Sequence, residues 1–101
     1  MDKLANFLGI IKKSGNLIYG PDKIKKKNAK NKVKSVIIAS DLSENSLKKL
    51  NSLNFKGMQK IRLTREEIER ATGKFTGTLG ILDEAMAKEL SKLIQQEETG
   101  I

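Results

Sequence analysis

The side chains whose type and spacing could carry chemistry are, above all, lysines. Seven of the twelve residues from 23 to 34 are lysine, and none of the twelve is acidic. Residues 1–34 contain ten lysines and two aspartates, a net charge of +8, whereas residues 35–101 contain ten basic and ten acidic side chains. Positive charge without acidic partners is typical of a surface that binds a polyanion such as nucleic acid. An ordinary solvated face is the alternative.

The spacing of these lysines favours a phosphate-binding helix. On a helix that turns about 100° per residue, Ile24 faces the protein interior and four lysines share an opposite stripe roughly 100° wide. Like charges on one stripe repel each other unless a polyanion neutralises them. Gly20 and Pro21 open this helix, so its first N–H groups and partial positive charge would also attract an anion. The stripe consists of Lys23, Lys26, Lys27 and Lys30.

A second cluster of candidate residues forms a glycine-bearing loop with one aromatic side chain. The sequence from 72 to 77 is Thr-Gly-Lys-Phe-Thr-Gly. Loops seldom carry a large apolar side chain, so we expect Phe75 either to tuck under the sheet edge or to pack against a partner. The Gly-Lys pair lacks the glycine spacing of a phosphate-binding P-loop, which argues against an NTPase. The candidate binding residues in this loop are Gly73, Lys74, Phe75 and Thr76.

The residue types that most enzymes use are absent. The chain has no cysteine and no histidine, which excludes disulfides, zinc–thiolate sites, a cysteine nucleophile and a Ser-His-Asp triad. Adjacent carboxylates such as Glu66 and Glu67 stand at expected helix starts, where they complement the helix dipole. We therefore expect a protein without enzymatic activity, cofactor or metal, with lysine-based chemistry as the alternative that the sequence leaves open.

Length and hydropathy predict one domain that needs no membrane. A chain of 101 residues with 38% hydrophobic residues suits a single domain with one modest core. No apolar run approaches the roughly 18 residues that span a bilayer, and the start of the chain lacks a signal-peptide pattern. The lysine-rich helix also has too small an apolar face for a membrane surface. We expect a cytoplasmic protein that forms one domain over residues 1–101, with 95–101 as a frayed tail.

Hydrophobic periodicity predicts five helices. Leu47, Leu50 and Leu53 form the expected apolar stripe of the third helix. The sequence from Thr64 has the spacing of a capping box, and Gly73 supplies a left-handed end to the helix that follows. The helices are expected over 3–13, over 20–31, after Asp41 or Ser43, from Thr64 to Gly73, and after Asp83.

Four short apolar segments between these helices predict strands. Gly80 lies within the last of them, where glycine marks close packing or a bulge. The resulting order of elements, α-β-α-β-α-β-α-β-α, is typical of an α/β fold with helices on both faces of a sheet. The strands are expected at 16–19, 35–40, 57–63 and 77–82.

The small number of aromatic residues bears on the kind of nucleic acid. Proteins that bind single strands on a sheet stack bases on several exposed aromatic side chains. This chain has four aromatic residues, and we expect Phe7 and Phe55 to lie in the core. It also lacks a helix-turn-helix signature and a cluster of base-reading arginines. Structured RNA is therefore the favoured nucleic acid, with double-stranded DNA as the alternative.

The order and spacing of several motifs resemble a known family. Residues 20–26, Gly-Pro-Asp-Lys-Ile-Lys-Lys, follow a short strand and an apolar N-terminal helix. This arrangement is similar to the start of the second helix in kink-turn-binding ribosomal proteins, the L-seven-Ae and L-thirty-e group, and above all in its small bacterial YlxQ-type members. The similarity covers roughly residues 3–94, with supporting segments LANFLGIIKKSGNLIYG, SVIIASDLSENS and ATGKFTGTLGILDEAMAKEL.

The resemblance implies both a fold and a partner. The fold would be a three-layer α/β/α sandwich with a mixed four-stranded sheet. The partner would be an RNA in which two helices flank a sharply bent internal loop. The loop at 73–76, with Phe75, matches the apolar loop by which the family covers a flipped-out nucleotide.

The same resemblance implies roles for the start of the second helix. Gly20 would approach the RNA backbone, and Lys26 would hold a phosphate. Pro21, Asp22 and Lys23 would face the bases at the bend. Kink-turn readers typically show Gly-Thr-Asn-Glu or Gly-Thr-Lys-Gln where this chain has Gly-Pro-Asp-Lys. Proline has no hydroxyl, the aspartate only accepts hydrogen bonds and the lysine only donates them, so the pattern offered to the bases is altered.

Together these observations predict non-enzymatic binding of structured RNA, either kink-turn-like or ribosomal, by a monomer within a ribonucleoprotein. The alternative is a protein-interaction module whose basic face docks an acidic partner. Neither interpretation requires a membrane, a metal or a cofactor.

Overall fold

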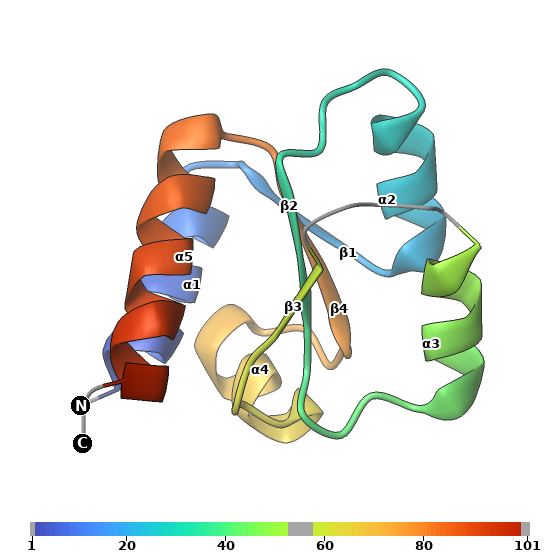
Figure 1. Cartoon of the computed structure of the whole chain (residues 1–101). Helices are drawn as coiled ribbons and strands as arrows, with labels where there is room; N and C mark the ends of the chain where they lie inside the picture. Colours follow the sequence, from blue (N-terminus) through green and yellow to red (C-terminus); the bar gives the residue numbers. More distant parts are fainter. Residues whose placement is uncertain (1, 53–57, 100–101) are drawn as a thin grey trace.

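The computed structural model describes residues 2–52 and 58–99. Five helices and four strands alternate along this part of the chain in the predicted order (Figure 1). The helices are α1 (Lys3–Lys13), α2 (Pro21–Asn28), α3 (Glu44–Asn51), α4 (Arg65–Thr72) and α5 (Glu84–Thr99). The strands are β1 (Leu17–Tyr19), β2 (Ser35–Ile38), β3 (Met58–Lys60) and β4 (Thr78–Ile81).

The four strands form one mixed sheet in the order β1-β4-β2-β3. Strand β4 runs antiparallel to both of its neighbours, and β2 and β3 are parallel. The two central strands, β2 and β4, are buried along their whole lengths. Strand β4 therefore connects β1, which leads into α2, with the rest of the sheet.

Helices cover both faces of this sheet, so the predicted α/β/α sandwich is confirmed (Figure 1). Side chains alternate between the two faces of a strand. On β2, Ile37 packs with α1, α4 and α5, whereas Val36 and Ile38 pack with α2 and α3. Phe7 of α1 packs against the larger cluster, as expected of a core residue.

Glycine at position 80 sets how closely α2 approaches the sheet. A Cβ at this position would lie 2.8 Å from Cγ1 of Ile18 and 3.0 Å from Cγ1 of Ile24. Ile24 is fully buried and is the buried residue of α2. Of the two alternatives for Gly80, close packing or a bulge, close packing is confirmed, and the contact fixes α2 against β1 and β4.

The residues that begin and end several helices agree with the sequence patterns. Thr64 accepts a hydrogen bond from a backbone N–H in the first turn of α4 and completes the predicted capping box. Gly73 ends that helix in the left-handed conformation, with φ of 82°. Asp83 caps α5 through its carboxylate. Of the two candidates for α3, Ser43 is the cap, because the carboxylate of Asp41 bonds elsewhere.

Helix α2 is shorter than predicted. It ends at Asn28, and Asn31 adopts a left-handed conformation with φ of 57°. The chain reverses there because Val33 must reach the core before β2 begins at Ser35. The prediction of a helix over 20–31 was therefore wrong at its C-terminal end, and Lys30 lies in a turn.

Three other expectations need correction. Strand β3 covers only Met58–Lys60, although Ile61 and Leu63 beyond it are buried. In α3, Leu50 is buried but Leu47 is exposed. Residues 95–99, part of the expected frayed tail, continue α5. The predictions for Leu53, Phe55 and Gly57 lie outside the described residues.

Candidate nucleic-acid interface

Pairing of β1 with β4 brings the two predicted clusters to one end of the sheet. Tyr19 is opposite Leu79, and the N–H of Gly20 donates to the carbonyl oxygen of Thr78 at 3.0 Å. Gly20 begins α2, and Thr78 directly follows the loop of residues 73–77. The start of α2 and this loop are therefore neighbours, although they are far apart in the sequence.

The N-terminus of α2 is open. Gly20 has φ of 88° and ψ of 151°, a conformation that is essentially restricted to glycine, and provides no side-chain cap. The N–H groups of the first turn of a helix have no intrahelical acceptor. Those of Asp22 and Lys23 therefore remain available to an anion, with the positive end of the helix dipole behind them.

The other four helices of the described chain close their N-termini with a side chain. Each cap accepts hydrogen bonds from backbone N–H groups of its own first turn. The capping residues are Asp2 for α1, Ser43 for α3, Thr64 for α4 and Asp83 for α5. The open start of α2 is thus a property of this one helix.

The lysines beside this helix start lack carboxylate partners, and most of them are exposed. Lys23 and Lys26 are exposed on α2, and Lys27 is half-buried. Lys30 follows the helix, so the predicted stripe has three lysines within α2 and a fourth in the turn. Among the residues that the structure describes, no carboxylate lies within ion-pair distance of any lysine between 23 and 34. This surface therefore keeps its full positive charge.

Phe75 is exposed at the tip of the loop. Its side chain is 55% exposed, so of the two alternatives for Phe75 the one in which it tucks under the sheet edge was wrong. The guanidinium carbon of Arg65 lies 5.6 Å from the centre of the ring, a distance at which a cation attracts the ring face. The hydroxyl of Thr76 accepts the N–H of Thr78 at 3.3 Å and fixes the loop to the start of β4. Lys74, the preceding residue, is also exposed.

Two residues that hold this loop were not identified from the sequence. The Asp41 carboxylate accepts the backbone N–H of Arg65 at 2.8 Å and lies 3.5 Å from its Nε. That backbone hydrogen bond, together with the nearby guanidinium, lowers the pKa of Asp41 below its usual value. Asp41 thus helps to hold Arg65 beneath Phe75, a contact between segments that no local pattern predicts.

Lys12 is a third addition to the site. A Cβ on Gly73 would lie 3.3 Å from its Nζ, which places the ammonium of α1 against the loop. From the sequence alone, Lys12 is recognisable only as a basic residue in the last turn of α1.

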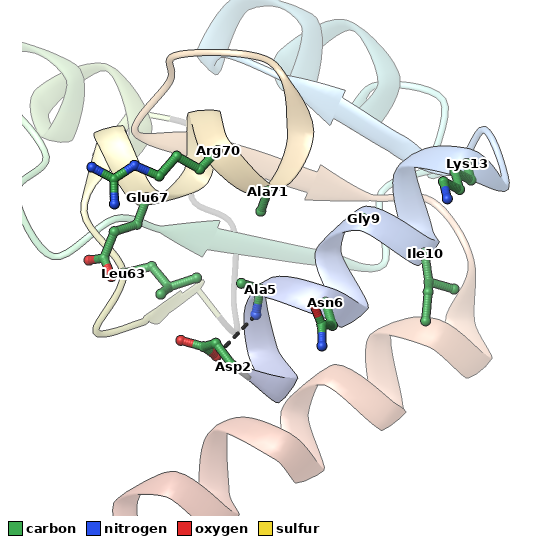
Figure 2. Close-up of a pocket in the computed structure, with 10 residues that line it drawn as sticks. All are labelled: Asp2, Ala5, Asn6, Gly9, Ile10, Lys13, Leu63, Glu67, Arg70 and Ala71. Atoms are coloured by element: carbon green, nitrogen blue, oxygen red, sulfur yellow. Dashed lines mark hydrogen bonds between the residues drawn. The ribbon is translucent and has the colours of Figure 1, made fainter.

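A separate groove lies between α1 and α4 (Figure 2). Its volume is about 450 Å³, and none of the predicted binding residues lines it. Its charged side chains are balanced, with Asp2 and Glu67 against Lys13 and Arg70. A groove without net charge does not attract a polyanion, so the open start of α2 and the loop remain the candidate interface.

Two further properties of the described residues bear on the function. They contain no group of three or more carboxylate, histidine or cysteine side chains that could hold a metal ion. Within residues 2–52 and 58–99, no helix combines the length and apolar character needed to cross a bilayer.

Comparison with known proteins reveals a close relative and similar structures. No protein-family model matches the sequence. The RNA-binding protein YlxQ of Enterococcus faecium is 32% identical over 95 residues, which cover 92% of this chain and 92% of the relative. A protein of unknown function from Bacillus halodurans has a TM-score of 0.83 and 26% identity, over 94% of this chain and 99% of its own.

A more distant structure shares the fold. The 15.5kD RNA binding protein of Giardia lamblia has a TM-score of 0.67 at 18% identity, over 97% of this chain and 87% of its own. The identity to the Enterococcus relative extends over nearly the whole of both chains. The chain therefore belongs to the YlxQ family.

Proposed function

We propose that this protein binds structured RNA, without covalent chemistry, at the open start of α2 and the adjacent loop. The observation that supports this most directly is the hydrogen bond from Gly20 to Thr78, which joins an uncapped helix start to an exposed aromatic loop. The names of the Enterococcus and Giardia proteins as RNA-binding proteins agree with this function.

In this proposal the lysines bind the RNA backbone. Lys23, Lys26 and Lys27 on α2, and Lys30 beyond it, neutralise phosphates, while Gly20 lets the backbone approach closely because it has no side chain. The N–H groups of the first turn of α2 donate to a phosphate oxygen. These contacts fix the position of the RNA without reading its sequence.

The loop supplies the contact that depends on RNA shape. Phe75 stacks on an unpaired nucleotide, since the ring is exposed and base–aromatic stacking does not require a particular base. Gly73 and Thr76 set the shape of the loop, and Lys74 adds positive charge at its tip. An RNA that is bent at an internal loop offers both a continuous backbone and such a nucleotide.

The residues at the start of α2 that would face the bent part of the RNA predict a preference for different bases. Pro21, Asp22 and Lys23 stand where kink-turn readers offer a different set of donors and acceptors. We therefore propose a bent internal-loop RNA, kink-turn-like or ribosomal, as the partner of a cytoplasmic protein.

The proposal is tested by titrating binding against salt. Neutralisation of about four phosphates predicts a slope of about −3 to −4 for log affinity against log salt. The variant Lys23→Ala/Lys26→Ala should bind more weakly and flatten the slope by about two. The matched control, Lys3→Ala/Lys60→Ala, removes the same charge from exposed positions outside α2 and should retain the slope.

The RNA used should include a bent internal-loop molecule and a fully paired one of equal length. Tighter binding to the bent RNA supports shape recognition. A salt-independent affinity for both molecules would refute the proposal. Partners pulled down from cells should disappear on nuclease treatment, whereas retention of an acidic protein would favour the interaction-module alternative.

A further inference from the structure

A second group of lysines surrounds a hollow at the opposite end of β4. The hollow, of about 560 Å³, lies between α5 and the start of β2. Ser35 of β2 is paired with Ile81, the last residue of β4, whereas Gly20 contacts its first residue. Four residues of strand span only about 10 Å between their ends. The lysines that line the hollow are Lys34, Lys88 and Lys92.

The charge of the hollow is positive and only partly neutralised. Lys88 lies 3.8 Å from the carboxylate of Glu84, the acidic residue of the lining. Lys34 and Lys92 have no carboxylate partner among the described residues. Lys88 and Lys92 are one turn apart on α5, where like charges repel each other. An anion in the hollow would relieve this repulsion.

Three uncharged polar residues of the lining can bind phosphate oxygens. Ser35, Gln59 and Ser91 carry hydroxyl and amide groups, and the Ser91 hydroxyl donates to Gln59 Oε1 at 3.3 Å. Serine, glutamine and lysine side chains are common ligands of nucleic-acid backbones. The chemistry of the hollow therefore suits a phosphodiester.

A row of lysines connects this hollow with α2. The segment between α2 and β2 passes over this end of the sheet (Figure 1). It carries Lys30 and Lys32, both exposed, between Lys27 and Lys34. A polyanion that leaves the lysines of α2 along this segment meets no carboxylate of the segment itself, because residues 23–34 contain none.

We propose that this hollow binds backbone phosphates of an arm of the RNA held at α2. The inference rests on the proposed function and extends it by naming a second contact region and the length of RNA that it requires. Phosphate contacts carry no base information, so the hollow increases affinity and directs the arm without adding sequence preference. An RNA that stops at the internal loop leaves the hollow empty.

The test varies the length of one RNA arm. Two RNAs share the same bent internal loop, and one has an arm a full helical turn longer. The wild-type protein should bind the longer RNA more tightly and with a steeper salt slope. The variant Lys34→Ala/Lys92→Ala should lose this gain, with a slope flatter by about two, but should bind the shorter RNA as the wild type does.

Two control variants distinguish the loss of positive charge in the hollow from a general effect on charge or folding. Lys34→Arg/Lys92→Arg keeps the charge and should keep the gain from the longer arm. Lys3→Ala/Lys60→Ala removes two lysines outside the hollow and should also keep it. Thermal unfolding of each variant shows whether the fold is unchanged.

The possible results are distinguishable. If Lys34→Ala/Lys92→Ala keeps the full gain from the longer arm, the hollow does not bind RNA and the inference is overturned. Binding of each protein to poly-glutamate, a stand-in for an acidic protein, is measured in parallel. If Lys34→Ala/Lys92→Ala loses binding to poly-glutamate but keeps the gain from the longer arm, the hollow binds an acidic protein instead of RNA. Failure of the wild type to bind either RNA overturns the proposed function itself.

Discussion

Helices α1 and α2 begin in opposite ways. At the start of α1, the Asp2 carboxylate accepts the N–H groups of Leu4 at 3.0 Å and Ala5 at 3.2 Å, and it also pairs with Arg62. At the start of α2, Gly20 supplies no side chain, and the first N–H groups remain open. One terminus satisfies its own polar groups, so it adds stability but offers nothing to a partner. The other leaves its donors available for one.

The charge around the two helix starts also differs: it is balanced at α1 and positive at α2. Asp2 lines a groove whose acidic and basic side chains balance. Beside α2, the lysines have no carboxylate partner in the described part of the chain. The closed, neutral terminus and the open, basic terminus can therefore be perturbed separately.

Among the changes that distinguish the two helix starts, substitution of Gly20 by alanine should have the largest effect on stability and on RNA affinity. A side chain at φ of 88° and ψ of 151° is strained, and we expect Gly20→Ala to lower the free energy of unfolding by about 1–3 kcal/mol. RNA affinity should fall as well, because relief of the strain moves the start of α2. Chemical denaturation and RNA titration measure the two effects.

A matched control exists in the turn after α1. Gly15 also has a positive φ, of 80°, and open space around its Cβ direction. Gly15→Ala should lower stability but leave RNA affinity unchanged in the folded protein. Equal loss of affinity in both variants would mean that stability alone governs binding.

Removal of the cap of α1 should have a smaller effect, and on stability only. Asp2→Ala leaves the Leu4 and Ala5 N–H groups without their acceptor, so the free energy of unfolding should fall by about 1 kcal/mol. Affinity for RNA should be retained, as measured by titration of the folded variant. A loss of affinity without a loss of stability would contradict the separation of the two helix starts.

The Asp2 cap should also make stability depend on pH. Partial burial acts to raise the pKa of Asp2, but hydrogen bonds from Arg62, Ala5 and Leu4 outweigh it and lower the pKa. Its contribution is fully present above the pKa of the unfolded chain, about 3.9, and is lost as pH falls through the lower pKa of the folded state. Unfolding midpoints should therefore fall less steeply in acid for Asp2→Asn than for the wild type. Parallel curves would show that Asp2 does not contribute.

The smallest expected effect concerns the end of the lysine stripe. Lys30 lies beyond α2, so Lys30→Ala should weaken RNA binding only about two- to threefold, as for an exposed ion contact. Lys26→Ala, within the helix, should weaken it more. Equal effects in a direct titration would indicate that the turn holds RNA as firmly as the helix does.

Much of this fold follows from local patterns in the sequence. The capping box at Thr64, the left-handed end at Gly73 and the cap at Asp83 depend on a few neighbouring residues, and the structure reproduces all three. The buried strand around Ile37 is also a local signal. The end of α2 was missed because the position of Val33 in the core, which forces the turn, depends on tertiary packing.

The candidate site was only partly predictable for the same reason. Charge and composition identify the lysines of α2 and the loop around Phe75. Contacts between remote segments place Asp41 and Arg65 beneath the loop and Lys12 beside it. Summed charge also concealed the hollow at α5, since two of its three lysines, Lys88 and Lys92, belong to the part of the sequence with no net charge.

The hydrogen bond between Gly20 and Thr78 has a consequence for the order in which the parts of the candidate interface form during synthesis. The lysine-rich third of the chain is synthesised first, but β4, which it needs as a neighbour, follows much later. Contacts between such distant residues form late in folding because closing a long loop is entropically costly. If the proposed interface binds RNA, we expect a nascent chain that ends before β4 to have the charge to attract RNA but to lack the geometry to select it.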